Sequence, residues 1–145
     1  MGTGAHGWLW RLRFAQARAE LALARGDWEA ALRSANSAIE QGHVRGRVKY
    51  QVLGLGARAR ALAGLGHSHE AIADLFSAVD LARPAGDPAL FLCAAAGLLA
   101  IDGDEGLAAE ASAAAKSILL ALPNAAMRQR FEDAEPVQLL RRLGR

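Results

Sequence analysis

The pattern of apolar and polar positions predicts helices along the whole chain. No stretch between the prolines alternates apolar and polar residues with the period of two that marks a half-buried β-strand. Proline is tolerated in the first turn of a helix but disrupts its interior, so Pro84, Pro88, Pro123 and Pro136 predict boundaries. The predicted helices cover residues 8–25, 28–42, 46–65, 69–83, 88–101, 104–121, 125–132 and 136–143.

Three segments of the chain repeat one another around a glycine. Gly26, Gly66 and Gly103 are 40 and 37 residues apart, and alanine stands at the same three offsets from each of them. We interpret each glycine as the left-handed end of a first helix, with the next Asp or Ser capping a second one. The recurrent alanines would mark the points where neighbouring helices nearly touch. They are Ala19, Ala59 and Ala96 before the glycines, then Ala31, Ala71 and Ala108, and Ala38, Ala78 and Ala115 after them.

This combination of a small residue in one helix, a turn glycine and two small residues in the next resembles the tetratricopeptide repeat (TPR). The chain departs from that repeat in its longer period, against the usual value of about 34 residues, and in lacking the closing proline. The early Trp position also reads Ala15, Leu55 and Leu92. The resemblance implies a right-handed α-solenoid of three TPR-like hairpins, over about 12–43, 52–83 and 89–121.

The C-terminal segment resembles the end of large bacterial signalling ATPases and transcriptional regulators that carry such repeats. The residues that carry this resemblance are Leu122-Pro123, Arg128 and Phe131, followed by a "P.V..L" segment. The resemblance implies a capping helix pair over 123–143 that covers the last hairpin, as terminal repeats require. We therefore expect a flexible leader over 1–7 and one TPR-like domain over 8–145.

Composition supports helices and excludes β architectures. Of 145 residues, 34 are Ala and 22 are Leu, whereas Val, Ile and Thr together number 10 and aromatic residues make up 6%. Sheets favour β-branched and aromatic side chains, so a sandwich, barrel or doubly wound sheet is excluded. A content of 52% hydrophobic and 22% charged residues excludes disorder.

The sequence favours a cytoplasmic location. Cys93 is the single cysteine, which fits a reducing compartment. The N-terminus lacks the basic-then-apolar order of a signal peptide. The longest uncharged apolar run, 89–101, is 13 residues long and too short to span a bilayer.

Charge is unevenly distributed along the chain. Residues 1–60 carry ten Lys or Arg and four acids, whereas residues 61–145 carry seven and eleven. Three interpretations remain open: solvated helix faces that differ by chance, an acidic partner at the first half, or head-to-tail contact between copies. The basic residues lack the interleaved aromatics of single-strand binding, which disfavours nucleic acid as a partner.

No group of residues predicts catalysis, a metal site or a cofactor. His67 and His69 point to different sides of a helix start, without the further ligands that zinc needs, so we expect turn and cap roles. Asp102 and Asp104 are expected at a helix N-terminus from its dipole alone. Cys93 has no histidine nearby in the sequence to activate it, and an enzyme would need a distant histidine and an acid to converge on it.

Glycines inside predicted helices indicate close approach. Gly54 and Gly56 lack the Lys-Ser/Thr ending of a phosphate-binding loop. Since glycine in a helix interior costs about 0.5–1 kcal/mol relative to alanine, these residues and Gly97 suggest close approach by another helix or by a ligand.

In the family that the chain resembles, the first helices of the hairpins line a concave groove. Members that grip a terminal carboxylate carry Lys, Asn and Arg there, whereas this chain has only Arg13 and Arg60 as basic residues and no Asn, which argues against a chaperone-tail receptor. The small, apolar floor suits an apolar helix or an extended peptide, unless the chain's own tail fills it. The partner-binding groove predicted from the resemblance contains Arg13, Gln16, Glu20, Leu53, Gly56, Arg60, Leu90, Cys93 and Gly97.

A second candidate surface is the start of the first helix. Trp8, Trp10 and Phe14 place apolar groups on more than one face, as an assembly patch for a missing preceding repeat or for a homodimer. The expected function is a non-enzymatic protein-interaction scaffold, the terminal repeat module of a larger signalling or regulatory protein. Its partners would be a protein, a peptide or adjoining domains. The alternative is a regulatory domain that senses a small ligand in the apolar groove.

Overall fold

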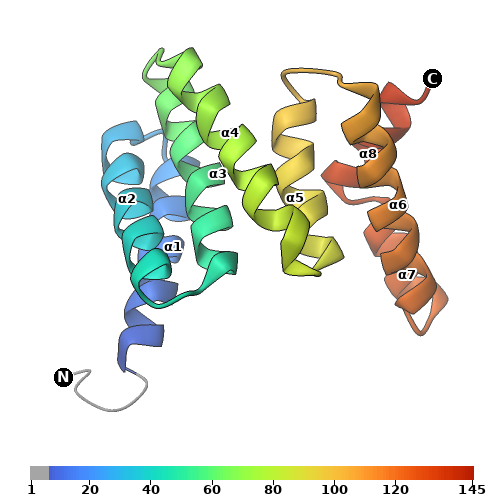
Figure 1. Ribbon diagram of the computed structural model, residues 1–145, viewed down its shortest axis with the longest axis horizontal. Coiled ribbons are helices and arrows are strands. Elements are labelled where there is room, and N and C mark those ends of the chain that lie inside the picture. The colour runs from blue at the N-terminus through green and yellow to red at the C-terminus, as the bar shows by residue number, and fades with distance from the viewer. Residues whose placement is uncertain (1–6) are drawn as a thin grey trace. The chain divides into compact units, whose positions relative to one another are not determined.

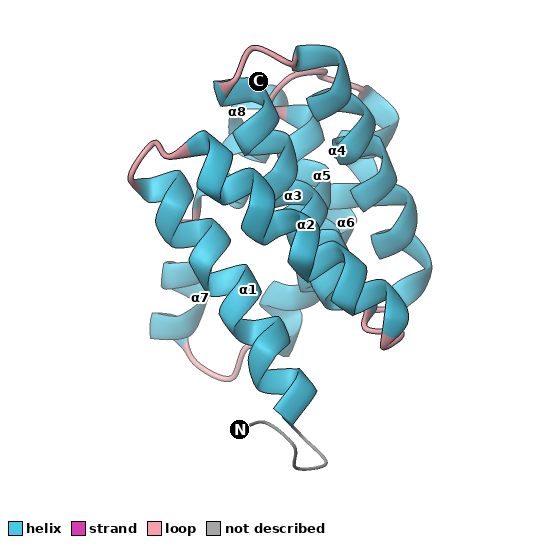
Figure 2. Ribbon diagram, turned by 90° about the vertical axis from the view of Figure 1, so that its left-hand side faces the viewer, coloured by secondary structure: helices cyan, strands magenta, loops and turns pink. Residues whose placement is uncertain are grey.

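The computed structural model describes residues 7–145, and within that range every regular element is a helix (Figures 1 and 2). The predicted all-α fold is thereby confirmed, and each expected helix end lies within two residues of the observed one. The helices are α1 (Gly7–Ala24), α2 (Trp28–Val44), α3 (Val48–Gly64), α4 (Ser68–Ala82), the short 3₁₀ helix η1 (Arg83–Ala85), α5 (Pro88–Leu99), α6 (Glu105–Ala121), α7 (Ala125–Glu132) and α8 (Glu135–Leu143).

The chain divides into two compact units. The first extends to Ala85 and contains α1 to α4 with η1, and the second covers Gly86–Arg145 with α5 to α8. Each unit is described by itself below, and the single domain expected over 8–145 stays a prediction. Gly7 belongs to α1 rather than to the expected leader over 1–7, whose other residues lie outside the described range.

Glycines in the left-handed conformation end the first three helices. At Gly26, with φ of 69°, the amide of the following residue donates to the carbonyl of Ala22 (2.9 Å), and the glycine's own amide donates to that of Leu23 (3.1 Å). This pair of bonds satisfies carbonyls that a helix end leaves without partners. Gly46 (φ 62°) and Gly66 (φ 85°) close α2 and α3 in the same way.

The left-handed glycines are twenty residues apart. Gly26, Gly46, Gly66 and Gly86 all have positive φ, and a helix begins two residues after each of them. One helix with its turn therefore takes twenty residues in the first unit, and a hairpin takes forty. The interpretation of Gly26 and Gly66 as turn residues is confirmed.

The third repeat departs from the sequence prediction. Gly103 does not have positive φ, and α5 ends four residues before it, so the expected left-handed turn at Gly103 is wrong. Ala96 and Ala108 are half-buried, whereas their counterparts in the first two repeats are buried. Ala108 lies beside the buried stripe of α6 rather than within it. This stripe consists of Leu107, Ala111 and Ala115.

Short polar side chains start several helices, as local sequence predicts, but not α4, whose N-cap is His67 without a side-chain hydrogen bond, so the cap expected from Ser68 is wrong. The carboxylate of Asp27 accepts from the amide of Ala30 (3.1 Å), and that of Asp104 accepts from Leu107 (2.6 Å). Asn124 accepts from Met127 (2.9 Å), which confirms the cap expected for the short helix α7. Each of these caps satisfies an amide that has no partner within its own helix.

Layers of alanine form the core of the first unit. Ala19, Ala35 and Ala57, contributed by α1, α2 and α3, are fully buried against one another. A second layer consists of Ala22, Ala31 and Ala61 from the same three helices. The prediction that small residues mark close helix contacts is confirmed here, because a methyl side chain lets two backbones approach without a clash.

In the second unit, α8 packs against both α5 and α6, while α7 contacts α8. Val137 is the buried residue of α8. The side-chain amide of Gln138 donates to the carbonyl of Glu132 (2.7 Å), which ties the start of α8 to the end of α7. No helix within residues 7–145 combines the length and apolarity needed to cross a bilayer.

Candidate functional site

Helix α1 exposes two large aromatic side chains. Trp10 is 59% exposed and Phe14 is 61% exposed. The guanidinium of Arg13 lies over the ring of Trp10, with its Cζ 5.5 Å from the ring centroid. Aromatic and arginine side chains are the types most enriched at protein interfaces. This face of α1 therefore has the composition of an interaction surface.

The third aromatic residue of the expected assembly patch lies elsewhere. Trp8 is half-buried, and its ring lies beneath Arg45 and Arg47, whose Cζ atoms are 5.4 and 4.9 Å from the ring centroid. Both arginines flank Gly46 in the turn between α2 and α3. Trp8 thus braces that turn, while Trp10 and Phe14 remain on the exposed side of the helix.

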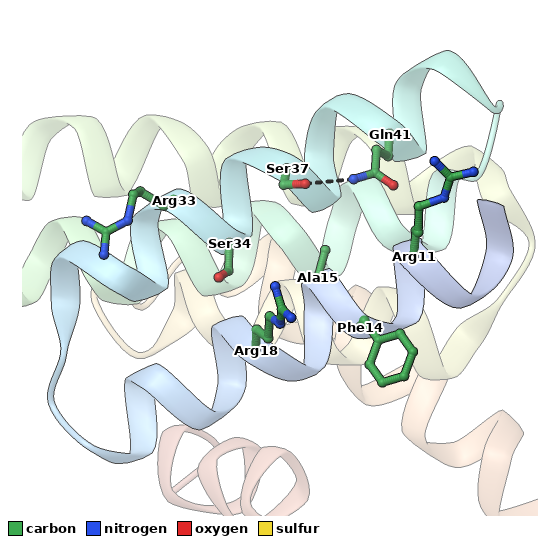
Figure 3. Close-up of a pocket in the computed structure, with 8 residues that line it drawn as sticks. All are labelled: Arg11, Phe14, Ala15, Arg18, Arg33, Ser34, Ser37 and Gln41. Carbon is green, nitrogen blue, oxygen red and sulfur yellow. Dashed lines mark hydrogen bonds between the residues drawn. The ribbon is translucent and has the colours of Figure 1, made fainter. Parts of the chain in front are cut away.

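A furrow runs between α1 and α2, with a volume of about 560 Å³ (Figure 3). Helix α1 contributes two arginines, an exposed phenylalanine and a buried alanine, and α2 contributes an arginine and three neutral polar residues. No acidic side chain is among these residues. We call this surface the arginine furrow; it consists of Arg11, Phe14, Ala15, Arg18, Arg33, Ser34, Ser37 and Gln41.

Within the first unit, three residues of the groove predicted from the resemblance form a network. The amide of Gln16 donates to the carboxylate of Glu20 (3.2 Å), which also accepts from Arg60 on α3 (2.6 Å). The Glu20 and Arg60 side chains are 47% and 55% exposed. These polar groups bind one another across α1 and α3, so less of their hydrogen-bonding capacity is left for a partner.

Gln16 itself is nine-tenths buried. Its side-chain nitrogen also donates weakly to the carbonyl of Leu53 (3.5 Å), but its side-chain oxygen is buried without a hydrogen-bond partner. An unsatisfied buried acceptor costs about 1–3 kcal/mol, whereas an apolar group of the same shape avoids this penalty. Gln16 therefore lowers the stability of the first unit.

We expect Gln16→Met to raise the free energy of unfolding by about 1 kcal/mol, because methionine fills the same space without the buried acceptor. Urea denaturation followed by tryptophan fluorescence measures this change. Gln16→Glu is the matched control, and it should destabilise the protein by placing a second carboxylate beside Glu20. A clear loss of stability in Gln16→Met would contradict this expectation. It would show that the two hydrogen bonds donated by the Gln16 side chain stabilise the protein by more than its unpaired oxygen destabilises it.

The other groove residues are divided between the units. Arg13 is exposed, and Leu53 and Gly56 are half-buried, all in the first unit. In the second unit, α5 carries Leu90, Cys93 and Gly97: Leu90 is buried, Cys93 is exposed and Gly97 is half-buried. That these residues line one continuous groove stays a prediction.

The two expected close-approach glycines of α3 behave differently. A Cβ atom at Gly54 would lie 2.8 Å from Cγ1 of Ile39 and 3.4 Å from the backbone oxygen of Ala35, both on α2. A Cβ atom at Gly56 would have nothing within 4 Å. Close helix approach is therefore confirmed at Gly54 and wrong at Gly56.

A buried ion pair was not apparent from the sequence. Arg58 on α3 binds Asp74 on α4 through two hydrogen bonds of 2.7 Å, and it also donates to Asn36 on α2 (3.1 Å). The Asp74 side chain is 11% exposed. Hydrogen bonding to Asp74 raises the pKa of Arg58 above its usual value. This group of side chains connects three helices, α2, α3 and α4.

The residues tested for catalysis have structural roles or stand alone. Asp104 is an N-cap, and the His67 ring lies 3.1 Å from the carboxylate of Glu70 in the first turn of α4. Across residues 7–145 no three His, Cys, Asp or Glu side chains gather where they could hold a metal ion.

Comparison with other proteins gives no indication of the function, which must be inferred from the residues of this chain. No protein-family model, no curated protein and no solved structure matches the chain. The resemblance to the tetratricopeptide repeat therefore stays a prediction, carried by the glycine and alanine positions alone.

Proposed function

We propose that this protein is a non-enzymatic protein-interaction scaffold. The observation that carries the proposal is the exposed face of α1. There the side chains of Trp10 and Phe14 are exposed to solvent, and Arg13 lies over the Trp10 ring. Burying one large aromatic side chain stabilises a complex by about 1.5–3 kcal/mol, so exposing two on one helix is costly unless a partner covers them.

The arrangement of the helices supports a repeat scaffold of the TPR type. In the first unit each helix packs against the next, α1 also contacts α3, and the turns recur every twenty residues. We propose that the hairpins α1–α2, α3–α4 and α5–α6 form a right-handed solenoid with α7 and α8 as its cap. By the resemblance of its tail, it would be the terminal module of a larger cytoplasmic signalling or regulatory protein.

Such a scaffold acts by holding side chains on a rigid set of helices where a partner can bind them, and it catalyses no reaction. The alanine layers hold α1, α2 and α3 at fixed spacing, so the exposed residues of α1 are positioned before a partner arrives. Pre-organisation of this kind lowers the entropic cost of binding.

Site-specific photo-crosslinking in cells tests the proposal. We expect a benzophenone amino acid in place of Phe14 to give discrete protein adducts, because a partner covers this position. The same probe in place of Leu120, which is 80% exposed on α6, is the control and should give none. An adduct of twice the mass of the chain would identify a second copy as the partner. Absence of any discrete adduct at position 14 would contradict the proposal.

A further inference from the structure

We propose that the arginine furrow binds an acidic amphipathic helix of a partner protein. The inference deepens the proposed function, on which it rests, by stating where the partner binds and which chemistry it carries. The occupant would place one apolar side chain against Phe14 and carboxylates against Arg11, Arg18 and Arg33.

The shape of the furrow suits a helix. Helices α1 and α2 are antiparallel neighbours joined at Gly26, and α3 packs against both of them through the alanine layers. Given 100° per residue, the mean direction of the furrow residues differs from that of the layer alanines by about 60° on α1 and by about 125° on α2. The furrow therefore lies between the same two helices, and the side chains that line it come from α1 on one side and from α2 on the other (Figure 3).

Charge identifies the occupant. Arg18 and Arg33 have no carboxylate partner within the described part of the chain, and no acid lines the furrow. Several arginines outside the furrow are paired with acids, namely Arg58–Asp74, Arg60–Glu20, Arg83–Asp80, Arg141–Glu132 and Arg142–Glu135. The furrow therefore concentrates positive charge that a partner's carboxylates can neutralise.

The spacing of the arginines matches a helical ligand. Arg11 and Arg18 are seven residues apart on α1, which separates them by about 10.5 Å along the axis. Carboxylates seven residues apart on a partner helix have the same separation and lie on one face. Between the two arginines, Phe14 is 61% exposed and can contact an apolar residue of that face.

Two other classes of ligand fit less well. A small anion would be poorly enclosed, since Arg11, Phe14 and Arg18 are all exposed, whereas small-molecule sites bury most of their ligand. Single-stranded nucleic acid needs successive aromatic platforms, and the furrow has one aromatic residue.

Binding of synthetic peptides to the full chain tests the inference. The probe is a fluorescent amphipathic peptide of about 18 residues, five helical turns, built from Leu and Glu, and its counterpart replaces every Glu with Gln. By fluorescence anisotropy we expect the Glu peptide to bind at least about ten-fold more tightly than the Gln peptide. The double change Arg18→Glu with Arg33→Glu should weaken binding by a similar factor.

Arg130→Glu, on the exposed side of α7, changes charge away from the furrow and should leave binding unaltered. The variants remove no ion pair found among residues 7–145, and circular dichroism tests whether they fold. The inference is overturned if the two peptides bind equally, if Arg130→Glu has the same effect as a furrow variant, or if a single-stranded oligonucleotide binds more tightly than the Glu peptide. Adducts at position 14 together with equal peptide binding would reject the acidic helix while leaving the scaffold function standing.

Discussion

Replacing Arg58 with methionine is expected to lower the free energy of unfolding by about 3 kcal/mol. The change removes both hydrogen bonds to Asp74 and leaves that carboxylate, with its side chain 11% exposed, without a counter-charge. A buried charge that loses its partner is among the most destabilising changes a point mutation makes. Methionine retains the unbranched apolar stem, so the loss reports mainly on the guanidinium.

Arg60→Met is the matched control on the same helix. Arg60 binds Glu20 at 2.6 Å, but both side chains are about half exposed, and such a pair contributes less than about 1 kcal/mol. Urea denaturation followed by tryptophan fluorescence compares the two variants. All three tryptophans lie in the first unit, so the signal reports unfolding of the part that contains both ion pairs. If the two variants lost the same free energy of unfolding, the burial of Asp74 would not be the reason for the destabilisation.

We do not expect the titration of Arg58 to make the stability of the protein depend on pH near neutrality. Its pKa in the folded protein is raised by the hydrogen bond to Asp74. A raised pKa contributes stability that is fully present below the pKa of the unfolded chain, and this stability is lost only as the pH rises through the higher pKa of the folded protein.

Gly54→Ala is expected to destabilise the protein by about 2 kcal/mol, although alanine is the better helix former. The new methyl group would lie 2.8 Å from Cγ1 of Ile39 and 3.3 Å from its backbone nitrogen, so α2 and α3 must move apart. Since these helices share the alanine layers, the movement also loosens the contacts of Ala35 and Ala57. Because two of the three close contacts are with backbone atoms of α2, a change in the Ile39 side chain alone does not relieve the overpacking.

The same substitution two residues later should have the opposite sign. Gly56 lies in the same helix with nothing within 4 Å of an added Cβ, so Gly56→Ala should stabilise by about 0.5–1 kcal/mol through helix propensity. Thermal unfolding followed by tryptophan fluorescence compares both variants with the parent. A stabilised Gly54→Ala protein would show that α2 and α3 are less tightly packed than the structure indicates.

Local chemistry explains why the helices could be predicted. Alanine and leucine favour helices, prolines mark the boundaries and residues such as Asp27 and Asn124 cap the starts. These effects act within a few residues, so they can be read without knowing the fold. The twenty-residue spacing of Gly26, Gly46, Gly66 and Gly86 is also present in the sequence, but Gly103 does not fit it, so repeats defined on Gly26, Gly66 and Gly103 do not show this spacing.

The candidate site could be predicted only in part. Trp10 and Phe14 were identified because a helix start with aromatics on several faces cannot bury them all. Trp8 could not be separated from them, since the arginines that cover it are about forty residues away. The arginine furrow could not be predicted, because its positive charge comes from two helices whose sequences are each typical of a solvent-exposed face.

By itself the sequence determined an all-helical chain, the positions of its helices and the small residues at which they meet. Only the tertiary structure decided which of two similar glycines is crowded, that Arg58 finds Asp74, and that Arg11, Arg18 and Arg33 border one furrow. This difference between what the sequence and the tertiary structure decide has a physical reason. Helix formation and capping are short-range, whereas the rotation of each helix about its axis is set by packing against its neighbours, and that rotation places every long side chain.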